Sequence, residues 1–173
     1  MPQTFSDKTR EIFVTGLRNA HAMEKQALSI MRPQVSRIEN YPAVAARLQQ
    51  HITETEEQIA RLDQILDGAG ESSSTLKDAA LSFMGTMAAL GHSMAGDEII
   101  KNSFANFAFE NFEIAAYTSL VTLAEAGGEA RALAVLQQNL AEEEAMADWL
   151  RQNLPSVTMQ FAGLKEAGAS AKI

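Results

Sequence analysis

Three glutamates interrupt the apolar stripes of three predicted helices. Steps of three and four residues from Phe13 reach Glu24, and the same steps reach Glu113 and Glu143 within the apolar stripes of two later helices. Each stands where the periodicity of a core-facing helix calls for an apolar residue. An isolated buried carboxylate costs several kcal/mol and usually takes up a proton. Because three helices repeat the pattern, we expect these carboxylates to share a partner.

Divalent cations are a natural partner, because each compensates several carboxylates at once. Oxygen-rich sites suit iron, manganese and other hard or borderline ions. The alternative interpretation is a set of protonated or water-bridged carboxyls in an ordinary core. Both interpretations need a fold that brings three helices together around one point.

Further ligand candidates lie one helical turn away from these positions or beside them. Glu110 precedes Glu113 by three residues, so both project to the same side of their helix. His51 and Glu54 have the same spacing, with His51 near the edge of the apolar arc and Glu54 farther out. Glu142 neighbours the core-phase Glu143 and can approach from the flank.

The periodicity predicts four long helices in an all-α chain. The connection between the second and third contains a shorter helix at about 76–90, so the order is two helices, a long crossover and two more helices. That connectivity is typical of an antiparallel, ferritin-like four-helix bundle. Prolines and glycines set the predicted boundaries, which are about 7–32, 43–66, 97–125 and 129–153.

Composition bounds the class of protein. The 173 residues fit one domain, with the bundle at 1–155 and a partly disordered tail at 156–173. A net charge of −8 without a basic patch argues against nucleic acid and membrane surfaces as partners. The absence of cysteine excludes disulfides and thiolate ligands. No signal segment or long apolar run is present, so we expect a soluble cytoplasmic protein.

Local strings on all four helices resemble motifs of the YciE/YciF-like family of ferritin-like bacterial stress proteins, over about residues 6 to 153. These strings are His21-Ala-Met-Glu24, His51-Ile-Thr-Glu54, Phe112-Glu113-Ile-Ala-Ala-Tyr117 and Leu140-Ala-Glu142-Glu143. The resemblance implies a stress-related homodimer with two divalent metal ions in each bundle, iron first, with manganese or zinc as alternatives. The metal ligands that it implies are Glu24, Glu54, Glu110, Glu113 and Glu143, together with His51 and Glu142.

Two positions depart from the family pattern. Asn111 stands where many relatives have histidine, and Ala147 replaces an acidic residue. The Glu-x-x-His pairs of di-iron bundles are also absent. We therefore expect a carboxylate-rich site that binds metal, and leave open whether it catalyses a ferroxidase or peroxide-scavenging reaction. The other hypothesis is a structural or interaction protein that keeps the bundle without metal chemistry.

Overall fold

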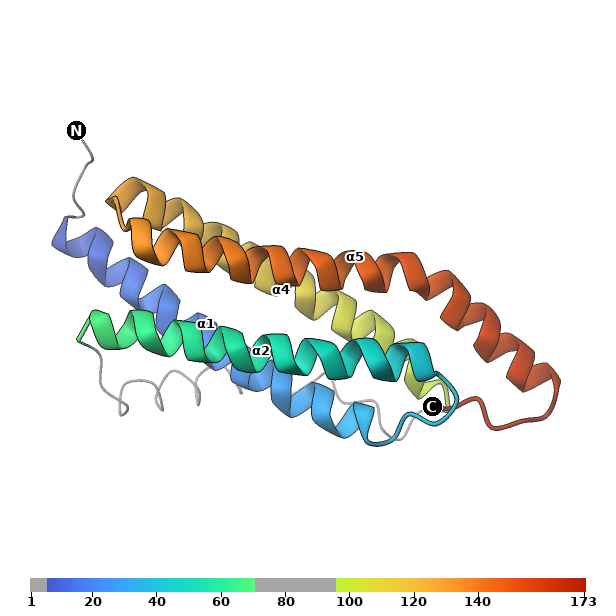
Figure 1. The fold of residues 1–173 in the computed structure, drawn as a ribbon. Coiled ribbons are helices and arrows are strands. Elements are labelled where there is room, and N and C mark those ends of the chain that lie inside the picture. Colours follow the sequence, from blue (N-terminus) through green and yellow to red (C-terminus); the bar gives the residue numbers. More distant parts are fainter. Residues whose placement is uncertain (1–5, 71–95) are drawn as a thin grey trace.

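A computed structural model describes residues 6–70 and 96–173 of the chain, and these residues form four long helices (Figure 1). No strand occurs in this part of the chain, so the predicted all-α fold is confirmed. The short helix expected at 76–90 lies outside the described residues. None of the described helices is long and apolar enough to cross a membrane. The helices are α1 (Asp7–Val35), α2 (Pro42–Gly68), α4 (Glu98–Gly127) and α5 (Ala130–Glu166).

The four helices pack as an antiparallel bundle. The neighbouring pairs are α1 with α2, α4 with α5, α1 with α4, and α2 with α5, and the partners in each pair run in opposite directions (Figure 1). Helix α2 ends at the end of the bundle opposite to the one where α4 begins. The two helix ends that the connection joins therefore lie at opposite ends of the bundle, as the predicted ferritin-like connectivity requires.

Local signals define several helix ends. The Ser6 hydroxyl accepts a hydrogen bond of 3.2 Å from the Thr9 amide and caps α1. Gly70, just after α2, and Gly128, between α4 and α5, have φ values of +82° and +69°. That left-handed conformation suits glycine, and it confirms the predicted breaks at these positions.

Two predicted helix ends at prolines are wrong. Helix α1 continues past Pro33 to Val35, and α5 continues past Pro155 to Glu166. A proline within a helix removes one hydrogen bond and costs about 3 kcal/mol. Beyond Pro155 the helix buries Val157 and packs two further apolar side chains on the core, which offsets that cost.

The C-terminal residues pack on the bundle instead of fraying as expected. The Tyr41 hydroxyl donates a hydrogen bond of 2.7 Å to the Ala171 carbonyl, and the Ile99 amide donates one of 2.9 Å to the Lys172 carbonyl. Lys172 also lies 3.3 Å from the buried carboxylate of Glu98. The end of the chain thus holds the first turns of α2 and α4 together.

Helices α1 and α4 pack closely against each other at Gly16. A Cβ atom built on Gly16 of α1 would lie 2.8 Å from Leu120 Cδ2 of α4, a distance that real Cβ atoms do not tolerate. Glycine at this position therefore permits the approach of the two helices. The polar residues in the middle of the core come from these two helices and from α2 and α5.

Candidate metal centre

Charged side chains from all four described helices meet in the middle of the bundle. Glu24 of α1, Glu113 of α4 and Glu143 of α5 are each 0 % exposed. His51 of α2 and Glu110 of α4 are 1 % and 3 % exposed. The core-phase positions therefore turn inward as the periodicity predicts, and they carry acids into a fully buried layer.

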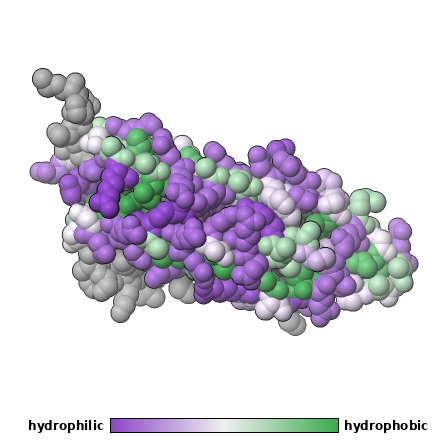
Figure 2. All heavy atoms as spheres, in the orientation of Figure 1, coloured by the Kyte–Doolittle hydropathy of each residue, from purple (hydrophilic) through white to green (hydrophobic). Residues whose placement is uncertain are grey.

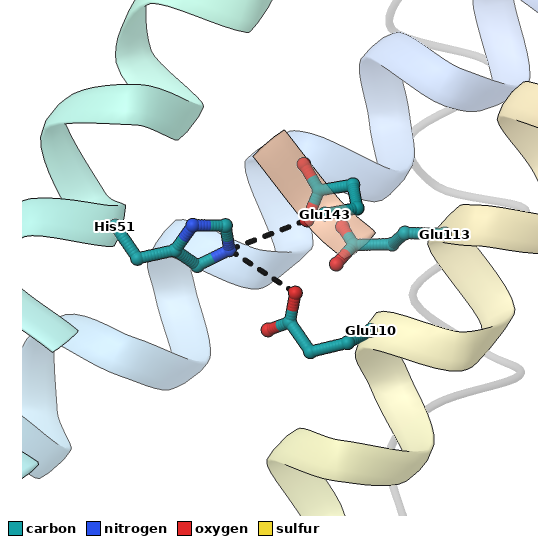
Figure 3. Close-up of side chains that lie close together, drawn as sticks. All are labelled: His51, Glu110, Glu113 and Glu143. Carbon is teal, nitrogen blue, oxygen red and sulfur yellow. Dashed lines mark ion pairs between the residues drawn. The ribbon is translucent and has the colours of Figure 1, made fainter. Parts of the chain in front are cut away.

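Four of these side chains converge on one point (Figure 3). His51, Glu110, Glu113 and Glu143 each offer a ligand atom, and these atoms all lie within 4.8 Å of one another. His51 Nε2 lies 3.2 Å from Glu110 Oε2 and 3.3 Å from Glu143 Oε2. One nitrogen and several carboxylate oxygens at this separation match the ligand types that iron, manganese and zinc accept.

Glu24 lies next to this cluster and is held by a hydrogen-bonded pair. The Tyr117 hydroxyl donates a hydrogen bond of 2.5 Å to Glu24 Oε1, and Asn139 Nδ2 donates one of 3.0 Å to the Tyr117 oxygen. Burial is the main cause that raises the pKa of Glu24 well above its usual range, and repulsion from Glu143 adds to the shift. The tyrosine contact fixes one oxygen of Glu24 and leaves the other available.

Burial is the largest cause of the pKa shifts of Glu113 and Glu110. It raises the pKa of Glu113 well above its usual range, and repulsion from Glu143 and Glu24 adds to this shift. Burial also raises the pKa of Glu110 to about 7, although the nearby His51 opposes it. Glu113 therefore holds a proton near neutral pH in the metal-free protein.

His51 is held as a cation by its carboxylate neighbours. Burial alone would lower its pKa, but the charge of Glu110 and hydrogen bonds to Glu110, Glu143 and Glu54 outweigh burial and raise the pKa well above its usual value. Its Nδ1 atom lies 2.9 Å from Glu54 Oε2. This contact orients the ring so that Nε2 faces the other acids.

Several buried oxygens in the site lack a hydrogen-bond donor. Over residues 6–70 and 96–173, neither oxygen of Glu113 and only one oxygen of Glu24 accepts a hydrogen bond. Buried polar atoms without partners are rare in folded proteins and call for an explanation. Acceptor-only oxygens aimed into a shared polar centre fit a divalent cation, so the donor set is compatible with the implied metals.

Glu54 and Glu142 lie on the flank of the cluster, not within it. Glu54 contacts Arg47 at 3.0 Å as well as His51, and the His51 hydrogen bond is the main cause that lowers its pKa to about 2. Glu142 accepts hydrogen bonds of 2.9 Å and 2.5 Å from Arg61. Both carboxylates thus already have cationic partners.

Two amides in the site were not predicted from the sequence. Gln58 Nε2 donates hydrogen bonds of 2.5 Å to Glu143 and 3.0 Å to Glu142, and Asn139 supports Tyr117. Both are 0 % exposed. An uncharged amide carries little signal in a sequence, although both fall on the inward faces of helices whose acids also point inward.

The remaining candidates lie away from the cluster or make no contact with it. His21 is buried, and its Nε2 atom lies 2.9 Å from Asp63. Asn111 is exposed and donates a hydrogen bond to the Phe107 carbonyl. Ala147 is buried one turn after Glu143, where a larger acid could have added a ligand.

The fold and the buried acids place this protein among the ferritin-like four-helix bundle proteins. The chain belongs to the DUF892 family, described as a domain of unknown function, which matches residues 8–163. It is 31% identical over 146 residues to protein YciF of Escherichia coli K12, covering 78% of this chain and 83% of that protein. The family resemblance seen in the sequence is therefore confirmed.

Solved structures of related proteins share the fold. A Xanthomonas campestris protein has a TM-score of 0.76 and 31% sequence identity, covering 91% of this chain and 99% of that one. The structure of the Escherichia coli stress protein YciF has a TM-score of 0.70 and 25% identity, covering 86% of this chain and 96% of that one. Both support the four-helix bundle as the fold of the described residues.

Proposed function

We propose that this protein binds two divalent metal ions, iron first, with manganese or zinc as alternatives, among the buried acids of its bundle. The observation that carries this proposal is Glu113, a fully buried carboxyl for which the described residues supply no hydrogen-bond donor to either oxygen. A metal ion needs such acceptor oxygens, and a folded core otherwise excludes them.

Charge balance supports a pair of ions. Glu24, Glu110, Glu113 and Glu143 carry four negative charges when ionised, and all four are buried. Two divalent cations would neutralise them with a neutral His51 as a nitrogen ligand. A single divalent cation would leave two buried charges, which the low dielectric of the core disfavours.

These five side chains would hold the metals, and Glu54 would fix His51 in its ligating orientation. Residues that orient a metal-binding histidine in this way raise metal affinity. Bound iron or manganese would supply one-electron chemistry at the site. The relative YciF is described as a stress protein. We propose a stress-related role for this chain on that basis, testable by its abundance in stressed and unstressed cells.

The test of metal binding is elemental analysis of protein purified without chelator and then loaded anaerobically with ferrous iron or with manganese. We expect two ions per chain in the wild type and at most one in Glu113→Gln, which keeps the shape but loses the charge. Glu144→Gln is the control for the charge change, because Glu144 is exposed on α5 and lies outside the cluster. Less than about half an ion per wild-type chain would contradict the proposal.

The second candidate function is a structural bundle without resident metal, and His51 is the observation that favours it. Its contacts of 3.2 Å and 3.3 Å with Glu110 and Glu143 provide a cation to two of the acids in the absence of metal. The protein would then keep its core closed with ion pairs and protonated carboxyls. This structural function does not account for Glu113, which has no ion pair with His51.

We further propose that a second copy of the chain covers one face of α4. Phe104 and Phe112 are 54% and 48% exposed, and with Ala108 and Ala115 they form a stripe at steps of three and four residues. Large exposed apolar surfaces of this kind mark contact sites in soluble proteins. A twofold contact would bury the stripe against itself, because the same face serves both partners.

A further inference from the structure

Helices α2 and α5 meet along a polar seam, formed on α2 by Arg47, Glu54, Gln58 and Arg61 and on α5 by Gln138 and Glu142. Of the four neighbouring helix pairs, this pair packs most sparsely. Figure 2 looks onto the same side of the molecule as Figure 1, and hydrophilic side chains cover the region between the two helices. The seam is therefore polar at the surface and loosely packed, as a route for a cation would have to be.

A line of three polar side chains crosses this seam. The Glu142 side chain is 21% exposed at the surface, whereas Gln58 and Glu143 are 0 % exposed. Gln58 Nε2 donates hydrogen bonds to both acids, of 3.0 Å to Glu142 and 2.5 Å to Glu143. The amide thus joins an exposed carboxylate to one of the converging acids in a single step.

Gln58 also has an unused acceptor. Its Oε1 atom is buried and accepts no hydrogen bond from the residues that the structure describes. Rotation of the amide exchanges its donor and acceptor positions, so the same side chain can present oxygen to a cation between the two acids. This buried, unpaired oxygen is independent of the acidic residues and points to a ligand that passes through the seam.

Arg61 closes the outer end of this line. It donates two hydrogen bonds to Glu142, of 2.9 Å and 2.5 Å, and its side chain is 14% exposed. The guanidinium places a positive charge at the entrance, where it repels cations until it leaves the carboxylate. Glu54 offers a less suitable entrance, because its inward neighbour is the ring nitrogen Nδ1 of His51, which Glu54 itself holds at 2.9 Å.

The α1 and α4 side of the centre offers no comparable opening. Glu24, Glu113 and Tyr117 are all 0 % exposed there. A cation that arrived from this side would have to pass between α1 and α4, which pack more closely than α2 and α5 do. The partly exposed contacts of the centre therefore lie on the α2 and α5 side.

We propose that divalent cations reach the metal centre through the α2–α5 seam, with Glu142 as the entry ligand, Gln58 as the relay and Arg61 as the gate. This inference rests on the proposed metal binding and adds to it a route of entry. Glu142 then acts during uptake and is not a ligand of the loaded site. Removing its charge should slow uptake and leave the final metal content unchanged.

The test compares uptake rates with equilibrium content. Metal-free full-length variants are mixed with Mn²⁺ in a stopped-flow instrument, and a fluorescent indicator reports the free ion. At low ionic strength we expect Glu142→Gln to take up Mn²⁺ about tenfold more slowly than the wild type, since a charge at an entrance changes association rates by that order. The control Glu144→Gln makes the same charge change two residues further along α5, at an exposed position, and should keep the wild-type rate.

Variants of Arg61 and Gln58 should change the rate of Mn²⁺ uptake in opposite directions. Arg61→Gln should accelerate uptake, because it removes the cation that occupies Glu142, whereas Gln58→Met should slow it. Glu142→Gln and Arg61→Gln should both end at two Mn²⁺ per chain, like the wild type. Slowing by Arg61→Gln, a wild-type rate in Glu142→Gln, or a lower final content in Glu142→Gln would overturn the route while leaving metal binding intact. Failure of the wild type to bind Mn²⁺ would instead overturn the proposed function and the route with it.

Discussion

The Tyr117 hydroxyl donates a hydrogen bond of 2.5 Å to Glu24 Oε1, while Glu24 Oε2 accepts none from the described part of the chain. One oxygen of the Glu24 carboxylate is thus hydrogen-bonded to the tyrosine, and the other is available to a ligand. Asn139 supports the tyrosine in turn, at 3.0 Å. A buried carboxyl in an ordinary core would be expected to use both oxygens, so the arrangement favours a ligand at Oε2.

Replacing Tyr117 with phenylalanine tests this relationship. The variant keeps the ring but leaves Glu24 Oε1 and Asn139 Nδ2 without partners, so we expect a loss of about 1–3 kcal/mol in the free energy of unfolding. Metal affinity should fall by about 10–100-fold, because Glu24 loses the group that orients it. Denaturant unfolding and metal titration measure the two effects.

Tyr41→Phe is the control for this variant. Tyr41 is equally buried and donates a hydrogen bond of 2.7 Å to the Ala171 carbonyl, at the end of the bundle and away from the acids. It should lose stability without losing metal affinity. Equal metal affinity in Tyr117→Phe and Tyr41→Phe would show that Tyr117 has no role in positioning Glu24.

Stability of the metal-free protein should fall as pH rises. Glu110 releases its proton near its ordinary pKa of 4.5 when unfolded and near 7 when folded. Between these pH values the folded state binds more protons than the unfolded state. The contribution of Glu110 to the free energy of unfolding is therefore complete below pH 4.5 and is lost as pH rises through about 7. The expected loss is on the order of 3 kcal/mol. Urea unfolding of chelator-treated protein at pH 5 and pH 8 measures it.

Glu110→Gln should flatten this dependence, because the amide does not titrate. Saturating metal should also reverse the trend, since the ions replace protons on the acids and bind better as pH rises. A free energy of unfolding that is independent of pH in the metal-free wild type would contradict the burial of ionisable acids that the structure describes.

Glu143→Leu separates the metal-binding function from the structural alternative. Without metal, the leucine should lower the free energy of unfolding, because it removes a buried partner of His51 and of Gln58. With metal at 100 times its Kd, the wild type should gain about 2.7 kcal/mol and the variant should gain little. Thermal unfolding with and without Mn²⁺ measures the difference, and an equal gain in both proteins would favour binding elsewhere.

The proposed dimer is tested by a charge in the apolar stripe of α4. Phe104→Glu should convert a particle of twice 18.8 kDa to one of 18.8 kDa, as measured by light scattering after size exclusion. Met159→Glu is the control, because Met159 is 71% exposed on α5 and lies outside the stripe. A wild type that is monomeric at all concentrations would rule out this contact.

Much of the fold and of the site could be predicted from the sequence. The apolar stripes predict four long helices in the observed order, because apolar residues recur every three or four positions and do not alternate as they would in a strand. Glu24, Glu113 and Glu143 stood out because a charged residue in an apolar phase is costly, and the structure buries all three. The periodicity predicts that these side chains are buried, but it does not identify the ligand that they would bind.

Other features depend on tertiary packing that no local pattern records. Pro155 predicts a helix end by its missing amide, yet apolar residues beyond it pack on the core and extend α5 to Glu166. The C-terminal residues have no periodic stripe, and backbone hydrogen bonds to distant residues hold them in place. Gln58 and Asn139 were missed because their importance comes from the acid and the hydroxyl that they contact.

Anomalous diffraction from crystals of the metal-loaded protein tests the central claim most directly. Data collected at the iron and manganese absorption edges would show which element is present and which side chains surround it. We expect two peaks per chain among Glu24, His51, Glu110, Glu113 and Glu143. A crystal grown with excess iron or manganese that shows no anomalous peak among these five side chains would contradict the account.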